Sequence, residues 1–238
     1  LGYQEVVSYA FTPEKWEKDL TNNSNPVRLL NPIASHLSVM RSSLTGSLVS
    51  VLKHNLGHRV DRLRVFEVAR TFVKDDSVDN SAMTVKGFRQ TWKLAGLAYG
   101  LADQLQWGAS SNRVVDFFDV KGDIEHLLAR GGLKADAKGV NQVNIEFKPS
   151  GHVALHPGRS AEVLLNGKAI GFLGELHPQW VQEYELPAAP VVFELLVENM
   201  LTRALPEFSE VSKQPVVIRD LAFVVSQTVQ AEAVKKAL

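Results

Sequence analysis

The sequence predicts an α+β fold in which a mostly antiparallel sheet is flanked by helices. The clearest sign is Asn166-Gly167, which joins two extended runs, residues 161–165 and 168–173. Asn-Gly is a preferred pair for a two-residue hairpin turn, because both turn residues need a positive φ. The predicted helices and strands also do not alternate strictly, which argues against a doubly wound parallel sheet.

The chain opens with a strand followed by a short helix. Residues 3–11 mix aromatic and β-branched side chains as strands do. Thr12-Pro13-Glu14 then supplies an N-cap, a first-turn proline and an early acid for a short helix through Trp16. Residues 27–30 are expected to form a short strand that stops at Asn31-Pro32.

A longer helix and two strands follow. Residues 42–55 carry a helical stripe that Gly57 closes, and the stripe consists of Leu44, Leu48, Val51, Leu52 and Leu56. Residues 62–72 have apolar side chains on both sides, which predicts a strand covered on both faces. A polar turn at 75–81 leads to a further strand at 92–101.

The second half continues the mixed pattern. Residues 119–130 form a helix ended by Gly131-Gly132, with a stripe made of Val120, Ile124, Leu127 and Leu128. Residues 191–197 and 221–225 are predicted strands, and a helix is expected at 228–238. The stretch 206–215 is interpreted as a domain boundary, so that two domains, 1–205 and 206–238, are expected.

Composition excludes several classes of protein. The 238 residues include 26 basic and 26 acidic side chains, and this balance argues against a nucleic-acid-coating protein or an acidic tail. The hydrophobic share of 45% predicts a soluble chain with a core, and no apolar run is long enough to cross a bilayer. No cysteine is present, which removes disulfides and thiolate sites. The first residues lack an initiator Met, so a fragment of a longer protein is expected.

Three histidines raise the question of a metal site. His152, His156 and His177, with Glu175 beside the third, could supply ligands. Prolines follow His156 and His177 directly, which disfavours the helical geometry that aligns two imidazoles. Turns stabilised by histidine side chains are therefore expected, and no metal ligand is assigned.

A basic cluster could meet phosphates or could be a solvated helix end. It consists of Lys53, His54, His58, Arg59, Arg62 and Arg64. Glu67 shares a strand face with apolar residues, so its carboxylate needs either a structural partner or a ligand. The structural partner is the favoured interpretation.

Several segments, in order, resemble the β-subunit family of bacterial phenylalanyl-tRNA synthetases. The longest match runs through Leu155-His156-Pro157-Gly158-Arg159 and then Gly171-Phe172-Leu173-Gly174-Glu175-Leu176-His177-Pro178. The segments Leu29-Leu30-Asn31-Pro32, Met40-Arg41-Ser42-Ser43-Leu44 and Phe66-Glu67-Val68-Ala69-Arg70 are also similar to that family. The resemblance covers essentially the whole chain.

The resemblance implies that residues 1–205 are a class II synthetase-like domain without catalytic activity. The four degenerate active-site positions that it points to are Val73, Glu194, Leu196 and Asn199. Val73 stands where catalytic members carry an arginine that clamps phosphate, and a valine cannot neutralise a phosphate. Glu194 and Leu196 replace glycines, and Asn199 replaces a second arginine. Residues 206–238 resemble the start of a ferredoxin-like anticodon-binding domain, incomplete and therefore expected to be mobile from 212 onward or packed on a neighbour.

Function is likewise implied by the resemblance. The parent enzyme would be a cytoplasmic α2β2 assembly that attaches phenylalanine to tRNA with ATP and Mg, and this part would be a scaffold for the catalytic α subunit, with no catalytic, cofactor or metal residue of its own. Two alternatives stay open: chemistry in the former cleft using Glu67, Arg70, Glu194 and His177, or a tRNA-binding module. The candidate RNA contacts are Arg59, Arg62, Lys213 and Arg219.

Overall fold

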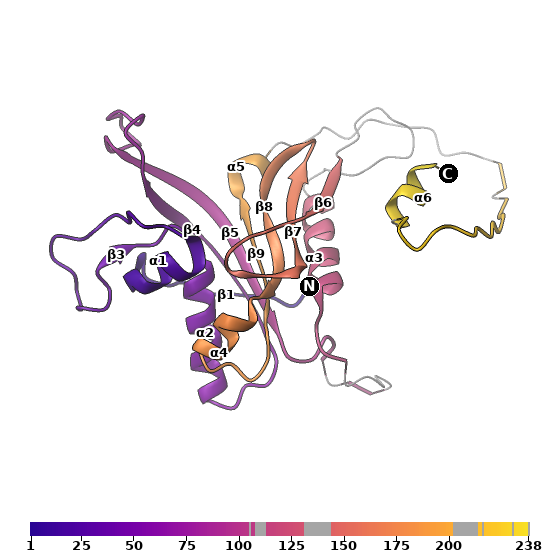
Figure 1. The fold of residues 1–238 in the computed structure, drawn as a ribbon, viewed down its shortest axis with the longest axis horizontal. Coiled ribbons are helices and arrows are strands. Elements are labelled where there is room, and N and C mark those ends of the chain that lie inside the picture. Colours follow the sequence, from indigo (N-terminus) through magenta and orange to yellow (C-terminus); the bar gives the residue numbers. More distant parts are fainter. Residues whose placement is uncertain are drawn as a thin grey trace. The chain divides into compact units, whose positions relative to one another are not determined.

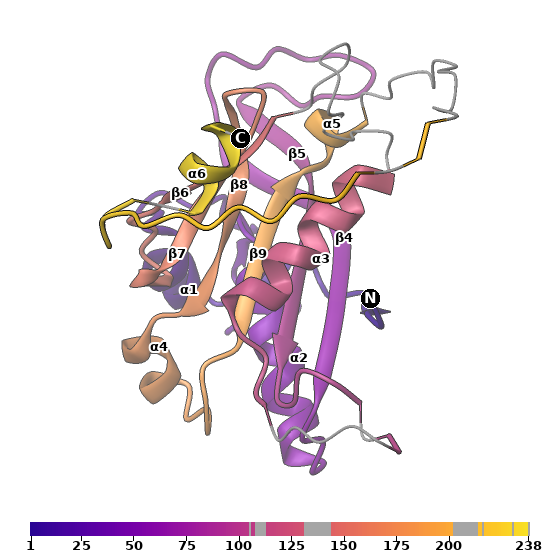
Figure 2. The same cartoon turned by 90° about the vertical axis from the view of Figure 1, so that its right-hand side faces the viewer.

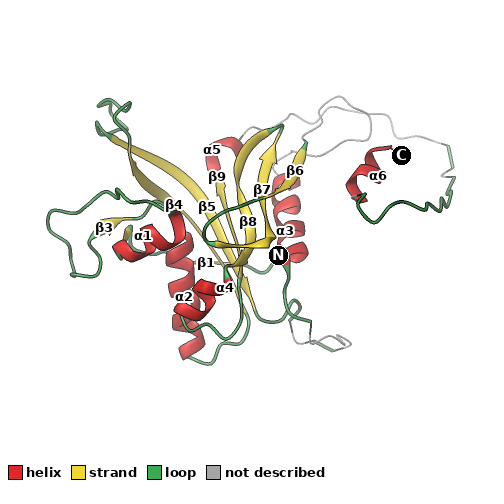
Figure 3. Ribbon diagram, viewed as in Figure 1, coloured by secondary structure: helices red, strands yellow, loops and turns green. Residues whose placement is uncertain are grey.

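A computed structural model describes residues 1–104, 106–107, 113–130, 144–201, 214–215, 217–229 and 231–237. The chain divides into two compact units, Leu1–Leu205 and Pro206–Leu238. The first unit contains a mixed sheet with helices on both faces (Figures 1 and 3). In the described part of the second unit, the one element is α6, Ala231–Ala237. The α+β class and the flanked sheet are confirmed, whereas the domain assignments stay predictions.

The described residues form a seven-stranded sheet in the order β1-β4-β5-β9-β8-β7-β6. Its strands are β1 (Gln4–Glu5), β4 (Leu63–Lys74), β5 (Phe88–Tyr99), β6 (Ile145–Pro149), β7 (Leu155–Leu165), β8 (Lys168–Leu176) and β9 (Val191–Leu196). The short β1 pairs with β4 in parallel, and the other pairs are antiparallel. The predicted antiparallel character is therefore confirmed.

Two helices cover opposite faces of this sheet. On one face, α2 (Thr45–Gly57) packs against β4, β5 and β9 and buries Leu48 and Leu52, together with its N-cap residue Leu44. On the other face, α3 (Phe117–Arg130) packs Val120 and Ile124 in a second core (Figure 2). Burying an apolar stripe of each helix stabilises the layers by about 25 cal/mol for each Å² removed from water. The smaller helices are α1 (Glu14–Thr21), α4 (Pro178–Glu183) and α5 (Val197–Met200).

The predicted hairpin is confirmed. Strands β7 and β8 are joined by Asn166 and Gly167, whose φ values are 52° and 76°. The predicted strands at 92–101 and 191–197 are β5 and β9, and the predicted helices at 42–55 and 119–130 are α2 and α3. Gly131 and Gly132, expected to end α3, lie outside the described residues.

The prediction for the first forty residues needs correction. Residues 3–11 do not form one strand, because the Ser8 N–H donates to the Glu67 carboxylate at 3.2 Å instead of to a neighbouring strand. The chain pairs again at β2 (Phe11–Thr12) with β3 (Val39–Met40). Pro13, not Thr12, occupies the N-cap position of α1, and this helix runs to Thr21, well past Trp16. Residues 27–30 form only an isolated bridge, from Arg28 to Val39.

Two later predictions are also wrong in part. Residues 221–225 are not a strand, because the described segment has no partner strand and Phe223 and Val224 are exposed. The strand 62–72 is not covered on both faces along its whole length, since Val68 on β4 is exposed. The sequence analysis assigned no elements to β6, α4 and α5.

Candidate functional site

The carboxylate of Glu194 on β9 is a buried polar group with three partners. Its side chain is 4% exposed. One oxygen accepts hydrogen bonds from the Ser43 hydroxyl and the Leu44 N–H, both at 2.7 Å. The other oxygen lies 2.7 Å from Nζ of Lys93, which also donates to the Ser42 carbonyl at 2.9 Å. A buried charge persists only when it is paired and hydrogen-bonded in this way.

Glu194 is held at the beginning of α2, and this placement has a physical reason. Leu44, the N-cap residue of α2, offers no side-chain cap. The Thr45 N–H donates to the nearby Ser43 hydroxyl at 3.1 Å, whereas the Leu44 N–H takes its acceptor from β9. A carboxylate at a helix N-terminus also complements the helix dipole. Gly171 on β8 lets that strand come close, because a Cβ there would lie 1.9 Å from the Glu194 carbonyl oxygen. Glu194 therefore joins β9 to α2.

A second buried carboxylate, Glu67 on β4, has a structural partner as predicted. The guanidinium of Arg41 lies 2.8 Å from Glu67, and both side chains are 3% exposed. Arg41 also donates to the Ser47 hydroxyl at 3.1 Å. The ion pair joins β4 to the start of α2, which is also the part of the helix that Glu194 contacts.

The structure brings three of the four positions predicted to be degenerate onto one face of the sheet. Strand register places Glu194 opposite Ala95 and Leu196 opposite Lys93, and the two-residue period puts Val73 on the same side of β4. Val73 pairs across the strands with Arg89, which forms an ion pair with Asp75. Asn199, on α5, accepts a hydrogen bond from Lys168 at 2.8 Å.

A pocket of about 290 Å³ opens beside Glu194 and Lys93. Its walls include Lys93, Glu194, His152 and Phe172, and the His152 ring stacks on Phe172 with centroids 4.0 Å apart. Burial lowers the pKa of His152, so its ring is favoured in the neutral form. Because Lys93 and Glu194 neutralise each other, the pocket offers little net attraction for an anion.

These residues do not fit ATP or its metal ion. A nucleotide phosphate needs a cation free to pair with it. Lys93, which lines the pocket, and Arg89, which lies opposite Val73, are already paired with Glu194 and Asp75. Within the described ranges, no group of three His, Cys, Asp or Glu side chains could hold a metal ion.

The three histidines considered as ligands instead stabilise turns, as predicted. Nδ1 of His152, His156 and His177 accepts a main-chain N–H two residues ahead, from Ala154, Gly158 and Gln179, at 3.3, 3.0 and 3.1 Å. His177 is the N-cap residue of α4.

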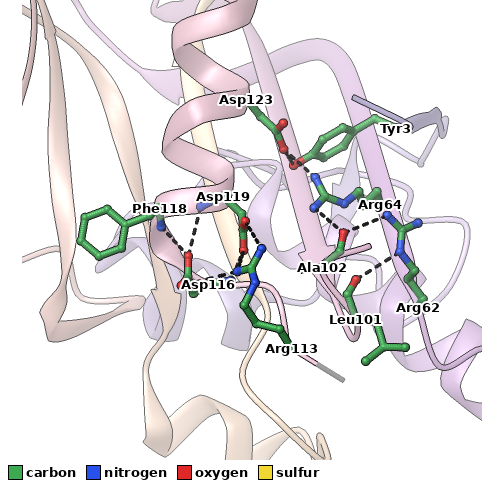
Figure 4. Close-up of polar contacts among 10 residues, drawn as sticks. All are labelled: Tyr3, Arg62, Arg64, Leu101, Ala102, Arg113, Asp116, Phe118, Asp119 and Asp123. Atoms are coloured by element: carbon green, nitrogen blue, oxygen red, sulfur yellow. Dashed lines mark hydrogen bonds and ion pairs between the residues drawn. The ribbon is translucent and has the colours of Figure 1, made fainter. Parts of the chain in front are cut away.

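The basic cluster divides into structural and exposed members. Arg62 donates to the carbonyls of Leu101 and Ala102 at 3.1 and 3.3 Å, and Arg64 pairs with Asp123 at 2.6 Å (Figure 4). Arg59 is exposed after the end of α2. The two RNA candidates Arg59 and Arg62 thus lie in one connection, between α2 and β4, but the Arg62 guanidinium already has protein partners.

The other two RNA candidates belong to the second unit. Arg219 is exposed there. Lys213 lies outside the described residues.

Sequence reasoning missed the side chains that complete these networks. Arg41, Ser43 and Lys93 hold the buried carboxylates, and Tyr3 donates to Asp123 at 3.0 Å. Burial and the neighbouring Asp123 charge raise the pKa of Tyr3. These pairs span up to 151 positions, so no local pattern could have revealed them.

One missed signal was local. The Asp116 carboxylate accepts the N–H groups of Phe118 and Asp119, while Asp119 accepts the Asp116 N–H at 2.9 Å (Figure 4). This reciprocal capping begins α3 and could have been found from the spacing of the two acids. Arg113 beside Asp119 holds the pKa of that carboxyl below its usual range.

Within the described ranges, the fold contains no helix that is both long and apolar enough to span a membrane.

Residues 1–197 match a family model described as the phenylalanyl-tRNA synthetase β chain CLM domain. Several curated relatives carry the name phenylalanine–tRNA ligase β subunit. The relative from Burkholderia pseudomallei (strain 1710b) is 50% identical over 99% of this chain and 28% of its own length. Those from Cupriavidus pinatubonensis and Bordetella pertussis are 48% and 50% identical, each over 97% of this chain and 27% of its own length. The chain therefore spans little more than a quarter of the curated relatives that it matches.

Proposed function

Because this chain belongs to the phenylalanyl-tRNA synthetase β-chain family, we propose that it is a non-catalytic scaffold part of a phenylalanine–tRNA ligase. The complete enzyme attaches phenylalanine to its tRNA with ATP. In it, a catalytic α subunit activates the amino acid, and this part of β supports α within an α2β2 assembly. The enzyme acts in the cytoplasm, and tRNA is bound by the complete enzyme.

The observation that carries this proposal is the engagement of Glu194. In a nucleotide site this position would be left free by a glycine, so that ATP could approach. Here the carboxylate bonds to Ser43, Leu44 and Lys93 and is structural. Val73 supplies no charge for a phosphate, and Asn199 is a neutral acceptor for Lys168. These positions support a class II-like domain, residues 1–205, whose copy of the active site is silent.

ATP and Mg belong to the parent enzyme in this proposal and not to this chain. A cation that could clamp a phosphate must be free, whereas Lys93 and Arg89 are paired internally. The chain's own residues thus provide packing surfaces and a fixed sheet, and no step of the reaction is assigned to them.

The second unit, residues 206–238, is proposed to begin a ferredoxin-like anticodon-binding domain. Helix α6 and the exposed residues Leu221, Phe223 and Val225 support an incomplete unit. Such a unit cannot bury its apolar side chains without further strands.

The alternative of residual chemistry in the former cleft is disfavoured. Glu67 and Glu194 form ion pairs with Arg41 and Lys93, respectively, and His177 caps α4. Arg70 lies on the opposite face of the sheet from Glu67 and stacks on Trp92. The four residues therefore do not form one site.

The proposal is tested by phenylalanine-dependent ATP–pyrophosphate exchange. The purified chain alone is expected to show no exchange, because Lys93 and Arg89, the cations that could clamp a phosphate, are paired with carboxylates. The catalytic subunit combined with the complete β subunit serves as the positive control. Exchange by this chain alone, above a sample from which the chain is depleted, would contradict the scaffold assignment.

A further inference from the structure

The sheet ends in a two-stranded extension, here called the distal arm, which consists of residues 70–74 of β4 and 88–92 of β5. Strand β9 begins to pair with β5 only at Lys93, so the arm has no third strand. Figure 1 shows these ends of β4 and β5 extending past the other strands. A two-stranded ribbon without cover is only marginally stable in water.

A notch of about 500 Å³ lies beside the arm, where β9 ends and α5 begins. It is lined by Arg89, Gln90, Thr91, Trp92, Leu196, Val197, Glu198 and Leu201. Two of its walls are apolar and open to solvent, since Trp92 is 47% exposed and Leu201 is 74% exposed. The notch therefore occupies the place that a longer β9 would fill.

The β5 edge facing the notch has free main-chain groups. On β4, the Phe72 N–H donates to the Arg41 carbonyl at 2.8 Å, on the side away from β5. The main-chain N–H and C=O groups of even-numbered residues of β4 therefore point away from β5. In an antiparallel ladder the hydrogen-bonded pairs alternate, and the register pairs Thr71 with Thr91. Gln90 therefore directs its N–H and C=O toward the notch, and no described residue hydrogen-bonds to them.

The side chains above this edge have the composition of a protein contact. The Arg70 guanidinium lies 5.2 Å from the centroid of the Trp92 ring and donates to the Gln90 side chain at 3.0 Å. Among the described residues, Arg70 forms no ion pair. Tryptophan and arginine are the residues that most often dominate binding energy at interfaces. An arginine held over an apolar ring without an acid favours a partner that brings a carboxylate.

We propose that the notch receives an extended segment of the catalytic subunit, which adds as a strand beside β5. The segment pairs with the main chain of Gln90, packs an apolar side chain against Trp92 and Leu201, and places a carboxylate within reach of Arg70. Addition of a strand to an exposed sheet edge is a recurring mode of peptide recognition. The proposal rests on the scaffold function and locates one of its contacts.

RNA is the less suitable occupant. Glu198 lines the notch and would repel phosphate, and Arg89 is already paired with Asp75. Leu196 and Leu201 present aliphatic walls, whereas single-stranded RNA is usually bound by basic grooves with stacking rings.

The test compares Gln90→Pro with Gln90→Ala in the complete β subunit, with affinity for the catalytic subunit as the readout. Proline removes the outward N–H but leaves the pairing with β4 intact, as at other edge positions. Alanine keeps the N–H and removes the same side chain. Gln90→Pro is expected to weaken assembly about 10-fold or more, and Gln90→Ala to leave it within about 2-fold.

Trp92→Ala is the second variant, and it is also expected to weaken assembly about 10-fold. Lys148→Glu, an exposed charge reversal on β6, should leave affinity unchanged. Thermal unfolding of each β variant shows whether it folds.

Wild-type affinity in both Gln90→Pro and Trp92→Ala would overturn the proposal, as would equal losses in Gln90→Pro and Gln90→Ala. Weaker tRNA binding with unchanged assembly would make RNA the occupant and overturn it as well. Failure of the wild-type subunits to assemble would instead contradict the proposed scaffold function.

Discussion

At the scale of single residues, this chain uses its buried charges to join elements. Glu194 accepts the N–H of Leu44, the N-cap residue of α2, and neutralises Lys93, and Glu67 pairs with Arg41 just before the same helix. Buried ion pairs contribute little net stability, but removing one partner leaves a charge that cannot be solvated. The two carboxylates therefore fix how α2 lies on the sheet.

Replacement of Glu194 by alanine is expected to destabilise the fold strongly. The change leaves Lys93, the Ser43 hydroxyl and the Leu44 N–H without their acceptor. Losing one partner of a buried pair costs about 3–5 kcal/mol in the free energy of unfolding. Urea denaturation of the chain measures this change.

Glu162→Ala is the control for this prediction, because Glu162 is an exposed glutamate on the adjacent part of the sheet. Surface substitutions usually change stability by less than about 0.5 kcal/mol. If both variants unfold at the wild-type urea concentration, Glu194 has no structural role and the argument for a silent site loses its main support.

The sequence alone identified which carboxylate needed a partner but not the partner itself. Glu67 could be singled out because it alternates with apolar residues along one strand. Arg41 lies 26 positions away and is brought to it only by packing. Glu194 was identified from the sequence as a position departing from a family pattern and as a candidate residue of the former cleft, with no sign of its bonds to Ser43.

At the scale of elements, local turn chemistry was the most reliable guide. Asn166-Gly167 adopts the positive φ values that its sequence requires, and the flanking strands pair as expected. The prediction of a strand over residues 3–11 was wrong because strand-like composition does not supply a neighbouring strand to pair with. The strand predicted at 221–225 was wrong for the same reason. Helices α2 and α3 were predicted because their apolar residues recur with the helical period.

Gly167→Ala is expected to weaken the β7–β8 hairpin. Gly167 has a φ of 76°, a conformation that costs an L-residue with a Cβ about 1–2 kcal/mol. The matched control is Gly122→Ala within α3, where a Cβ meets nothing within 4 Å. Alanine there should stabilise the helix by about 0.5–1 kcal/mol. Thermal unfolding compares the two variants, and a melting temperature of Gly122→Ala below that of Gly167→Ala would contradict the argument from φ.

At the scale of the whole molecule, the order of the strands is the feature that the sequence could not supply. Strand β9 lies between β5 and β8, although it follows both in the chain. That insertion brings Glu194 to α2, sets Lys93 opposite Leu196, and leaves the distal arm without a third strand. The class of fold follows from local patterns, but the site depends on this long-range order.

The neutral overall charge, with 26 basic and 26 acidic residues, agrees with a part that packs mainly against protein. Many of its arginines are paired internally, as Arg41, Arg64 and Arg113 are. We therefore expect this chain to bind tRNA weakly by itself, since phosphate binding needs free cations.

Isothermal titration of this chain with ATP and Mg measures whether its copy of the active site is silent. If the site is silent, no saturable heat is expected, because Glu194 is engaged with Ser43 and Leu44, and the cations Lys93 and Arg89 are already paired with carboxylates. The complete enzyme, titrated in the same buffer, provides the positive control. Saturable binding of one ATP per chain would contradict the account.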